Sequence, residues 1–262
     1  MLTKFQRCQI TARICAGLLV FAGCGSPSWA DPPTQQKKAA DARAAADTGK
    51  PATKGGAAIP DPKQVGGEPE GIVQVANLIY AGVKSSHCFS DHFLMAAEKT
   101  STISTSRRFH AVKLASGELF NYPLVIMTGE GSFSLTDIER QNLLAYVERG
   151  GFLLASASCS SQEWNRSFRA EIARIFKDHP LRSIPMDHPL FNTVTKITTL
   201  KAHHGTPRPL EGVSLGGRLG VVYSQDGLND TAHTQGCCCC GGNEIENCVE
   251  VNVNILAYAV IY

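Results

Sequence analysis

One cysteine stands where a thiol could act as a nucleophile. Cys159 follows the apolar stretch 152–157 and precedes a helical pattern that begins near Ser160. The backbone N–H groups of an incoming helix stabilise a thiolate, and they also hold the oxyanion that forms when the thiolate attacks a carbonyl group. A cysteine-dependent enzyme that acts on a carbonyl group would use Cys159 as its nucleophile and His188 or His203 as its base. A small buried thiol at the start of a helix is the alternative interpretation.

Charged residues in predicted loops suggest ligand binding. Glu130 lies between two glycines after the apolar stretch 122–127, and Arg166 lies near the start of the helix that follows Cys159. Arginine at such a place can hold a carboxylate or a phosphate, although surface salt bridges explain both side chains as well. Asp187 precedes His188 in an Asp-His-Pro sequence that is also a good turn former. We therefore treat Glu130, Arg166 and Asp187 as candidate ligand-binding residues.

A run of cysteines near the C-terminus suggests either metal binding or disulfide formation. It comprises Cys237, Cys238, Cys239 and Cys240, with Cys248 further on. Neighbouring side chains of an extended chain point to opposite sides, so the four cannot all reach one ion. Two of them, with Cys248 and either His233 or His203, could still hold zinc. An unstructured surface loop is a third interpretation, and we assign no cofactor from the sequence.

The N-terminus predicts export. Lys4, Arg7 and Arg13 precede a short apolar run at 14–23, and Ser28-Trp29-Ala30 has the small residues of a signal-peptidase site. We place the cleavage after Ala30, which gives a signal peptide at 1–30. The alternative is a lipoprotein box in which Cys24 is lipidated and becomes the new N-terminus. Either processing leads to a periplasmic or secreted protein, lipid-anchored only in the second case.

Export also changes the interpretation of the cysteines. Disulfides form in exported proteins, so the tract at 237–240 is expected to form disulfides more readily than a zinc site. Of the ten cysteines, three precede Ala30, which leaves seven in the mature chain. An odd number leaves at least one thiol over, or one that pairs between chains.

The remaining sequence separates into a linker and one domain. Residues 31–69 are rich in Ala, Lys, Asp, Pro and Gly and nearly lack large apolar residues, which is typical of a disordered spacer. From residue 70 to 262, apolar stretches predict strands in alternation with helices. The predicted strands are 72–80, 109–114, 122–127, 152–157 and 218–223, and the predicted helices are 91–100, 134–149, 160–177 and 249–262. Ser134 is expected to cap the second of these helices and Ser160 the third. This alternation is typical of a three-layer α/β domain with a doubly wound, mostly parallel sheet.

Motifs along this domain resemble a bacterial family, domain of unknown function 4159, which is related in fold to class I glutamine amidotransferases. The resemblance covers about residues 71–262. The stretches that carry it are Tyr122 to Gly131, Gly150 to Leu154, Trp164 to Arg169, Pro185 to Phe191, and Leu210 to Val213 with Tyr223-Ser224. The resemblance implies the fold and implies no activity, because fold alone does not give a function.

This sequence departs from the amidotransferases at the residues that do chemistry. Their nucleophile lies in a Gly-x-Cys-x-Gly turn, whereas Ala157 and Ser161 stand at the glycine positions here. Their late His-x-Glu pair has no counterpart in this chain. In sheets of this kind, ligands bind beyond the carboxyl ends of the strands, which selects the loops 129–131 and 157–161. We therefore expect a non-catalytic binding or interaction module with its crevice near Glu130, Cys159 and Arg166.

The composition argues against nucleic acid as a partner but does not identify the partner. The formal net charge is +2 and the chain has no long block of like charge, so nothing supports nucleic-acid binding. The expected partner is a cell-envelope protein or a small molecule. Membrane contact is expected only through a lipid on Cys24. A cysteine-dependent hydrolase or amidotransferase-like enzyme with Cys159 as its nucleophile is the first alternative. A metal- or redox-responsive protein that uses Cys237 to Cys248 is the second.

Overall fold

The computed structural model describes residues 71–84, 88–234 and 242–262. The predicted signal peptide, the linker, Cys24 and the cysteines at 237–240 lie outside the described residues. Among the described residues, no helix combines the length and the apolar character needed to cross a bilayer.

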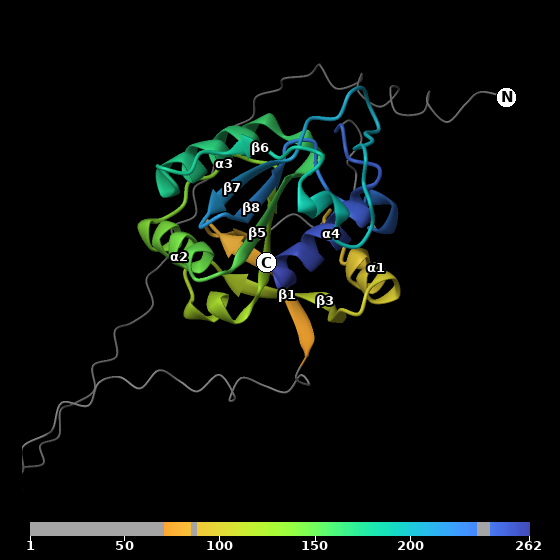
Figure 1. Ribbon diagram of the computed structural model, residues 1–262. Coiled ribbons are helices and arrows are strands. Elements are labelled where there is room, and N and C mark those ends of the chain that lie inside the picture. The colour runs from red at the N-terminus through yellow and green to blue at the C-terminus, as the bar shows by residue number, and fades with distance from the viewer. Residues whose placement is uncertain (1–70, 85–87, 235–241) are drawn as a thin grey trace, which may run out of the picture. The chain divides into compact units, whose positions relative to one another are not determined.

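A mostly parallel sheet forms the centre of the domain (Figure 1). Its parallel strands lie in the order β3 (Ser104–Lys113), β1 (Ile72–Tyr80), β4 (Leu124–Gly129), β5 (Phe152–Ala157) and β8 (Arg218–Ser224). Antiparallel strands β7 (Glu211–Leu215) and β6 (Arg182–Ser183) extend the sheet beyond β8, and β2 (Val83–Lys84) forms a hairpin with β1. Counted along the chain, the parallel strands have the 2-1-3-4-5 order of flavodoxin-like sheets. The predicted α/β fold class is therefore confirmed.

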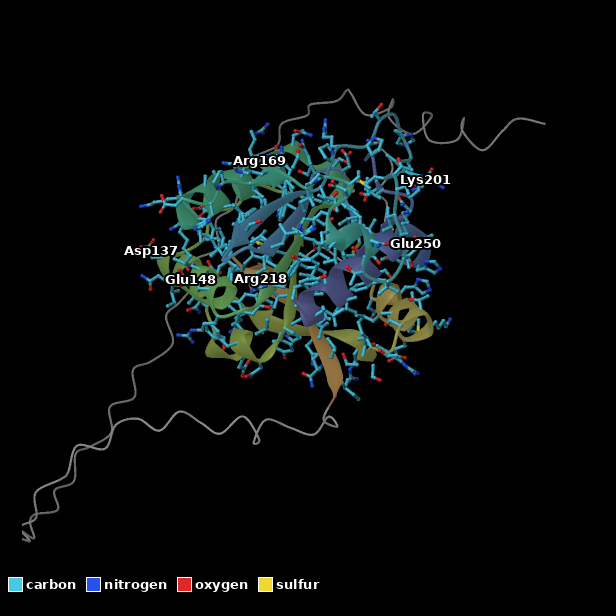
Figure 2. The ribbon with its side chains drawn as sticks, viewed as in Figure 1. Asp137, Glu148, Arg169, Lys201, Arg218 and Glu250 are labelled. Atoms are coloured by element: carbon cyan, nitrogen blue, oxygen red, sulfur yellow. The ribbon has the colours of Figure 1, made fainter. Side chains whose placement is uncertain are left out.

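Helices cover both faces of this sheet, which explains why its central strands are mostly apolar and buried on both sides. Helices α1 (His92–Thr100) and α4 (Cys248–Ile261) pack on one face, and α2 (Asp137–Glu148) and α3 (Gln162–Ile175) pack on the other (Figure 1). Leu124 and Ile126 of β4 face the α1–α4 layer, whereas Val125 and Met127 face the α2–α3 layer. Figure 2 shows Asp137 and Glu148 on the outer side of α2, where both are exposed.

Short 3-10 helices connect several of these elements. They are η3 (Gly117–Asn121), η4 (Ser158–Ser160), η5 (Pro189–Asn192) and η6 (Thr231–His233). The second of them, η4, follows β5 directly and contains Cys159. The fourth, η6, lies in the connection that leaves β8. Both therefore belong to the edge of the sheet where the parallel strands end.

The strongest sequence patterns predict their elements closely. The strands expected at 72–80 and 152–157 have those bounds, and the apolar side chains Trp164, Phe168 and Ile172 of α3 are all buried on one face. The expected helix caps are displaced. Thr136, rather than Ser134, caps α2 through a capping box with Glu139.

The caps differ because a neighbouring polar residue takes each role. Ser134 donates to Glu171 of α3 instead of capping α2. At the start of α3, Ser161 rather than Ser160 accepts from the N–H of Trp164. Ser160 instead donates to the carbonyl oxygen of Asp226, which follows β8. Tertiary contacts thus decide which of two adjacent serines forms a cap.

Candidate ligand-binding site at the carboxyl edge

Four chain segments meet beyond the carboxyl ends of β4, β5 and β8. They are 129–131 after β4, 158–161 after β5, 225–230 after β8, and 242–247 before α4. Hydrogen bonds of the two serines after β5 join these segments. Ser161 Oγ donates to the carbonyl oxygen of Glu130, whereas Ser160 Oγ accepts from the N–H of Asn243 and donates to the carbonyl oxygen of Asp226. We call this group of loops the carboxyl-edge crevice.

Cys159 lies at the centre of the crevice in an unusual backbone conformation. Its φ is 51° and its ψ is 30°, and φ of the next residue, Ser160, is 50°. Residues other than glycine seldom adopt this left-handed region, and the cost of doing so is found mainly at functional sites. The Sγ atom of Cys159 lies 3.9 Å from Oε1 of Glu130. The structure therefore brings together two of the residues that the sequence singles out.

Glu244 holds the backbone of Cys159 from the other side. Its Oε1 accepts from the N–H of Cys159 at 3.1 Å, and both of its carboxylate oxygens accept from Nδ2 of Asn229 at 3.1 Å. Only 2% of Glu244 is exposed, and this burial raises the pKa of its carboxyl group to about 7, against the lowering effect of those hydrogen bonds. A buried carboxyl group thus holds the N–H that a nucleophilic cysteine would offer to an oxyanion.

Close backbone packing fixes this arrangement. A Cβ atom on Gly242 would lie 2.7 Å from the carbonyl carbon of Cys159, so the two backbones touch. Asp226, which is 1% exposed, accepts from the backbone N–H of Arg208 at 2.6 Å and pairs with its guanidinium at 3.1 Å. Asn243 donates from Nδ2 to the same carboxylate at 3.3 Å. The loop before α4 is therefore tied to the loop after β8.

Beneath the crevice lie buried polar atoms that lack a hydrogen-bond partner among the described residues. They are Thr128 Oγ1, Ser158 Oγ, Asn229 Oδ1 and Asn252 Oδ1. Thr128 is paired in register with Ser156, whose Oγ accepts from the N–H of Leu228 at 2.8 Å. Asn252 donates to the carbonyl oxygen of that same leucine at 3.0 Å. Thr128 and Asn252 thus lie on the α1–α4 side of the sheet, and Ser158 and Asn229 follow the carboxyl ends of β5 and β8.

His188 and Asp187 are not brought to this crevice. The His188 ring packs 5.6 Å from the ring of Tyr258, which in turn lies 5.9 Å from Phe152 at the start of β5. Cys159 follows the opposite end of that strand. Nδ1 of His188 accepts from the N–H of Leu190 as a cap of η5, and burial lowers its pKa. Asp187 is exposed beside it, so the pair forms a turn near the amino edge of the sheet.

Arg166 and His203 have different positions around the crevice. Arg166 is exposed on α3, whereas the buried network of that helix uses Arg169, which pairs with Glu211. His203 is nearer: its backbone N–H donates to the carbonyl oxygen of Glu244 at 3.0 Å, and its ring lies 3.6 Å from the Glu246 carboxylate. Of the histidines that the sequence offers as a base, His203 is the one that the backbone ties to this edge.

Besides Cys159, the described residues include the cysteines Cys88 and Cys248, and the two are held differently. Cys88 is disulfide-bonded. Cys248 is buried and its thiol donates to the carbonyl oxygen of Asn229 at 3.6 Å. Burial, together with the negative charges of Asp230 and Glu244, raises the pKa of the Cys248 thiol to about 12. This thiol is therefore protonated in the folded chain and points into the protein.

Several residues of the crevice are absent from the sequence-based expectation. Asp226, Asn229 and Asp230 follow strand β8, and Glu244 precedes α4. The rule that selects the loops after β4 and β5 also applies to the loop after β8, so the sequence holds a signal for the first three. Glu244 has none, because it reaches the crevice only through the path of the chain between β8 and α4.

A separate hollow lies at the opposite edge of the sheet, on the α2 side. Its volume is about 330 Å³. It is lined by Phe120, Asn121, Tyr122, Pro123, Tyr146, Arg149, Gly150 and Gly151. Since α/β sheets place their ligands at the carboxyl edge, and since the unpartnered polar atoms named above lie there, we take the crevice as the candidate site.

The fold is that of an α/β domain whose carboxyl edge carries a group of loops joined by hydrogen bonds. The sequence matches the family described as Domain of unknown function (DUF4159) over residues 76–260. The chain belongs to this family, as its motifs indicate. No similar sequence was found among the curated proteins.

Proposed function

We propose that the protein is an exported, non-catalytic binding module of the cell envelope, and that its ligand occupies the carboxyl-edge crevice. The observation that carries the proposal is the set of buried, unpartnered atoms on Thr128, Ser158, Asn229 and Asn252. Each such atom costs about 1–3 kcal/mol of folding free energy. A ligand that enters between the loops, or a water molecule that it orders there, would form hydrogen bonds with these atoms and recover this cost on binding.

The chemistry of these atoms narrows the class of ligand. The amide oxygens of Asn229 and Asn252 are acceptors, the hydroxyl groups can accept, and Glu130 adds an exposed carboxylate at the rim. A small molecule rich in hydrogen-bond donors, such as an amine, an amide or a hydroxylated compound, complements this set. A cationic group on it would be favoured by Glu130.

The contacts of Cys159 support a role without catalysis. Its N–H is bonded to Glu244, so this donor is engaged in holding the fold. Carboxyl groups lie on both sides of the residue, from Glu130 and from Glu244. An oxyanion needs donors aimed at it, and negative charge beside it opposes its formation. The left-handed backbone of Cys159 then serves to bring the loops after β4 and β5 together.

Export is supported by the basic and apolar N-terminal pattern and by the disulfide bond of Cys88, because disulfides persist in oxidising compartments. Residues 31–69 then serve as a spacer. Under the alternative processing at Cys24, the same spacer connects the domain to a membrane.

Native mass spectrometry of the protein purified from its own cell envelope tests the proposal. We expect a non-covalent added mass that is released by gentle collisional activation and whose occupancy falls in Asn229→Leu. The variant Glu148→Ala, at an exposed position on the outer side of α2, is the control for the effect of substitution itself. Protein that never carries an added mass, even after incubation with envelope extract, contradicts the binding module. A covalent mass on Cys159 supports the cysteine enzyme instead, for which the strained backbone at Cys159 is the favouring observation.

A further inference from the structure

We propose that His92, Asp230 and His233 form a binding site for one divalent transition-metal ion of the zinc class. Asp230 follows Asn229 in the loop after β8, but none of the three residues carries one of the unpartnered atoms of the proposed small-molecule site, and the inference rests on its own geometry. Asp230 and His233 belong to the chain that follows β8, and His92 is the first residue of α1. The site therefore joins two elements that lie far apart in the sequence.

Three ligand atoms already converge at this place. Nδ1 of His92 lies 3.2 Å from Oδ2 of Asp230, and Nδ1 of His233 lies 2.7 Å from the same oxygen. One ligand atom from each of the three residues lies within 4.8 Å of the other two. Zinc bonds of about 2.0–2.1 Å in tetrahedral geometry separate two ligand atoms by roughly 3.3 Å. Side-chain rotations that bring the ligand atoms from within 4.8 Å of one another to this separation would allow all three to bind one ion.

The ligands are held in place before any ion binds. The backbone oxygen of Asp230 accepts from the N–H of His233 at 3.2 Å and from Oγ1 of Thr234 at 2.9 Å, which closes the turn η6. The N–H of His92 donates to Oγ of Ser90 at 3.1 Å. The two imidazole rings are stacked at 3.7 Å with an interplanar angle of 13°. Such preorganisation lowers the entropy that binding would otherwise cost.

Burial gives the site a closed side and an open side. The Asp230 side chain is 7% exposed, whereas the side chains of His92 and His233 are 30% and 49% exposed. A nearly buried carboxylate needs a positive partner, and a divalent ion supplies one. Three protein ligands with solvent on one side leave a fourth position of a tetrahedral ion open.

The donor set selects the kind of metal. Two imidazole nitrogens and one carboxylate oxygen suit zinc and the neighbouring first-row divalent ions, whereas calcium and magnesium prefer oxygen ligands alone. The buried thiol of Cys248 is engaged with the carbonyl oxygen of Asn229 and is not part of the proposed site. Of the residues that the structure describes, those at the site are therefore expected to bind through nitrogen and oxygen without sulfur.

Titration of the mature protein, purified without an affinity tag and stripped with a chelator, tests the proposal. Isothermal titration with zinc chloride should give one equivalent of tight binding. The absorption spectrum with cobalt(II) should show the visible bands of a low-coordinate ion without a sulfur-to-metal charge-transfer band. His92→Ala and His233→Ala should each weaken zinc binding by more than about tenfold, since even the loss of groups that orient ligands costs that much.

His203→Ala is the matched control, because His203 is also a surface imidazole beside a carboxylate, at 3.6 Å from Glu246. Its zinc affinity should stay within about twofold of the wild type. The melting temperatures of the zinc-free variants are measured alongside, and Asp230→Asn, which preserves the shape of the side chain, repeats the test should an alanine variant fold poorly. The absence of zinc binding overturns the proposal. So does binding that survives in His92→Ala and His233→Ala, or cobalt spectra with sulfur ligation.

Discussion

Replacement of Glu244 by glutamine should remove a pH-dependent cost from the stability of the domain. Glu244 is 2% exposed, and burial raises the pKa of its carboxyl group from 4.5 to about 7. The folded chain therefore binds a proton at this carboxyl more tightly than the unfolded chain does. Glutamine preserves a neutral acceptor for the N–H of Cys159 and removes the titration.

The sign and the size follow from linkage. Below pH 4.5 the carboxyl group is protonated in both states, so it contributes no difference. Between pH 4.5 and about 7 the unfolded chain loses its proton while the folded chain keeps it, and stability falls as the pH rises. Above pH 7 the loss is complete. A pKa change from 4.5 to about 7 corresponds to about 3 kcal/mol. Between pH 5 and pH 8, wild type should thus lose about 2–3 kcal/mol relative to Glu244→Gln.

Urea unfolding at pH 5 and at pH 8 measures this difference, because it gives the free energy of unfolding of each protein at each pH. Other titrating groups cancel in the comparison of the two proteins. Glu246→Gln, an exposed carboxylate in the same loop, is the control and should track wild type at both pH values. The account of this buried carboxyl group is refuted if wild type and Glu244→Gln differ in free energy of unfolding by the same amount at pH 5 and at pH 8.

Two further predictions concern the crevice and the N-terminus. Gly242→Ala should lower the free energy of unfolding by about 1–3 kcal/mol, because its Cβ would lie 2.7 Å from the backbone of Cys159. The control Gly117→Ala, which has nothing within 4 Å of the added atom, should change the free energy of unfolding little. Equal effects of the two substitutions in urea unfolding would contradict the close packing at Gly242. Mass spectrometry of the mature protein should find an N-terminus at Asp31; a lipidated Cys24 would show that the alternative processing is correct.

The sheet could be predicted from the sequence because its signals are local. The run 152–157 is apolar except for Ser156, which is typical of a strand covered on both faces, and the spacing of Trp164, Phe168 and Ile172 is typical of a helical face. Strand β7 was missed, since Glu211 to Leu215 is short and lies at the antiparallel edge of the sheet. The capping serines were misplaced by one or two residues because tertiary hydrogen bonds decide between adjacent candidates.

The candidate site was less predictable, because its residues come from loops that only the fold brings together. The rule of the carboxyl edge finds Glu130 and Cys159, which are 3.9 Å apart between Oε1 and Sγ. It does not find Glu244, whose place depends on the chain path before α4. Nor does it pair His92 with Asp230, which are separated by 138 positions in the sequence. The adjacent Asp187 made His188 a candidate base, whereas the fold places His188 beside Tyr258 near the amino edge of the sheet.

The stability of Ser158→Ala tests the central claim most directly, namely that buried polar atoms at the carboxyl edge are kept for a ligand. The Oγ of Ser158 is buried without a hydrogen-bond partner among the described residues. Its removal from the ligand-free protein should raise the free energy of unfolding by about 1–3 kcal/mol, which urea unfolding would detect. Thr128→Val should have an effect of the same sign. A loss of stability in Ser158→Ala would show that the hydroxyl serves the fold itself, and would contradict the account.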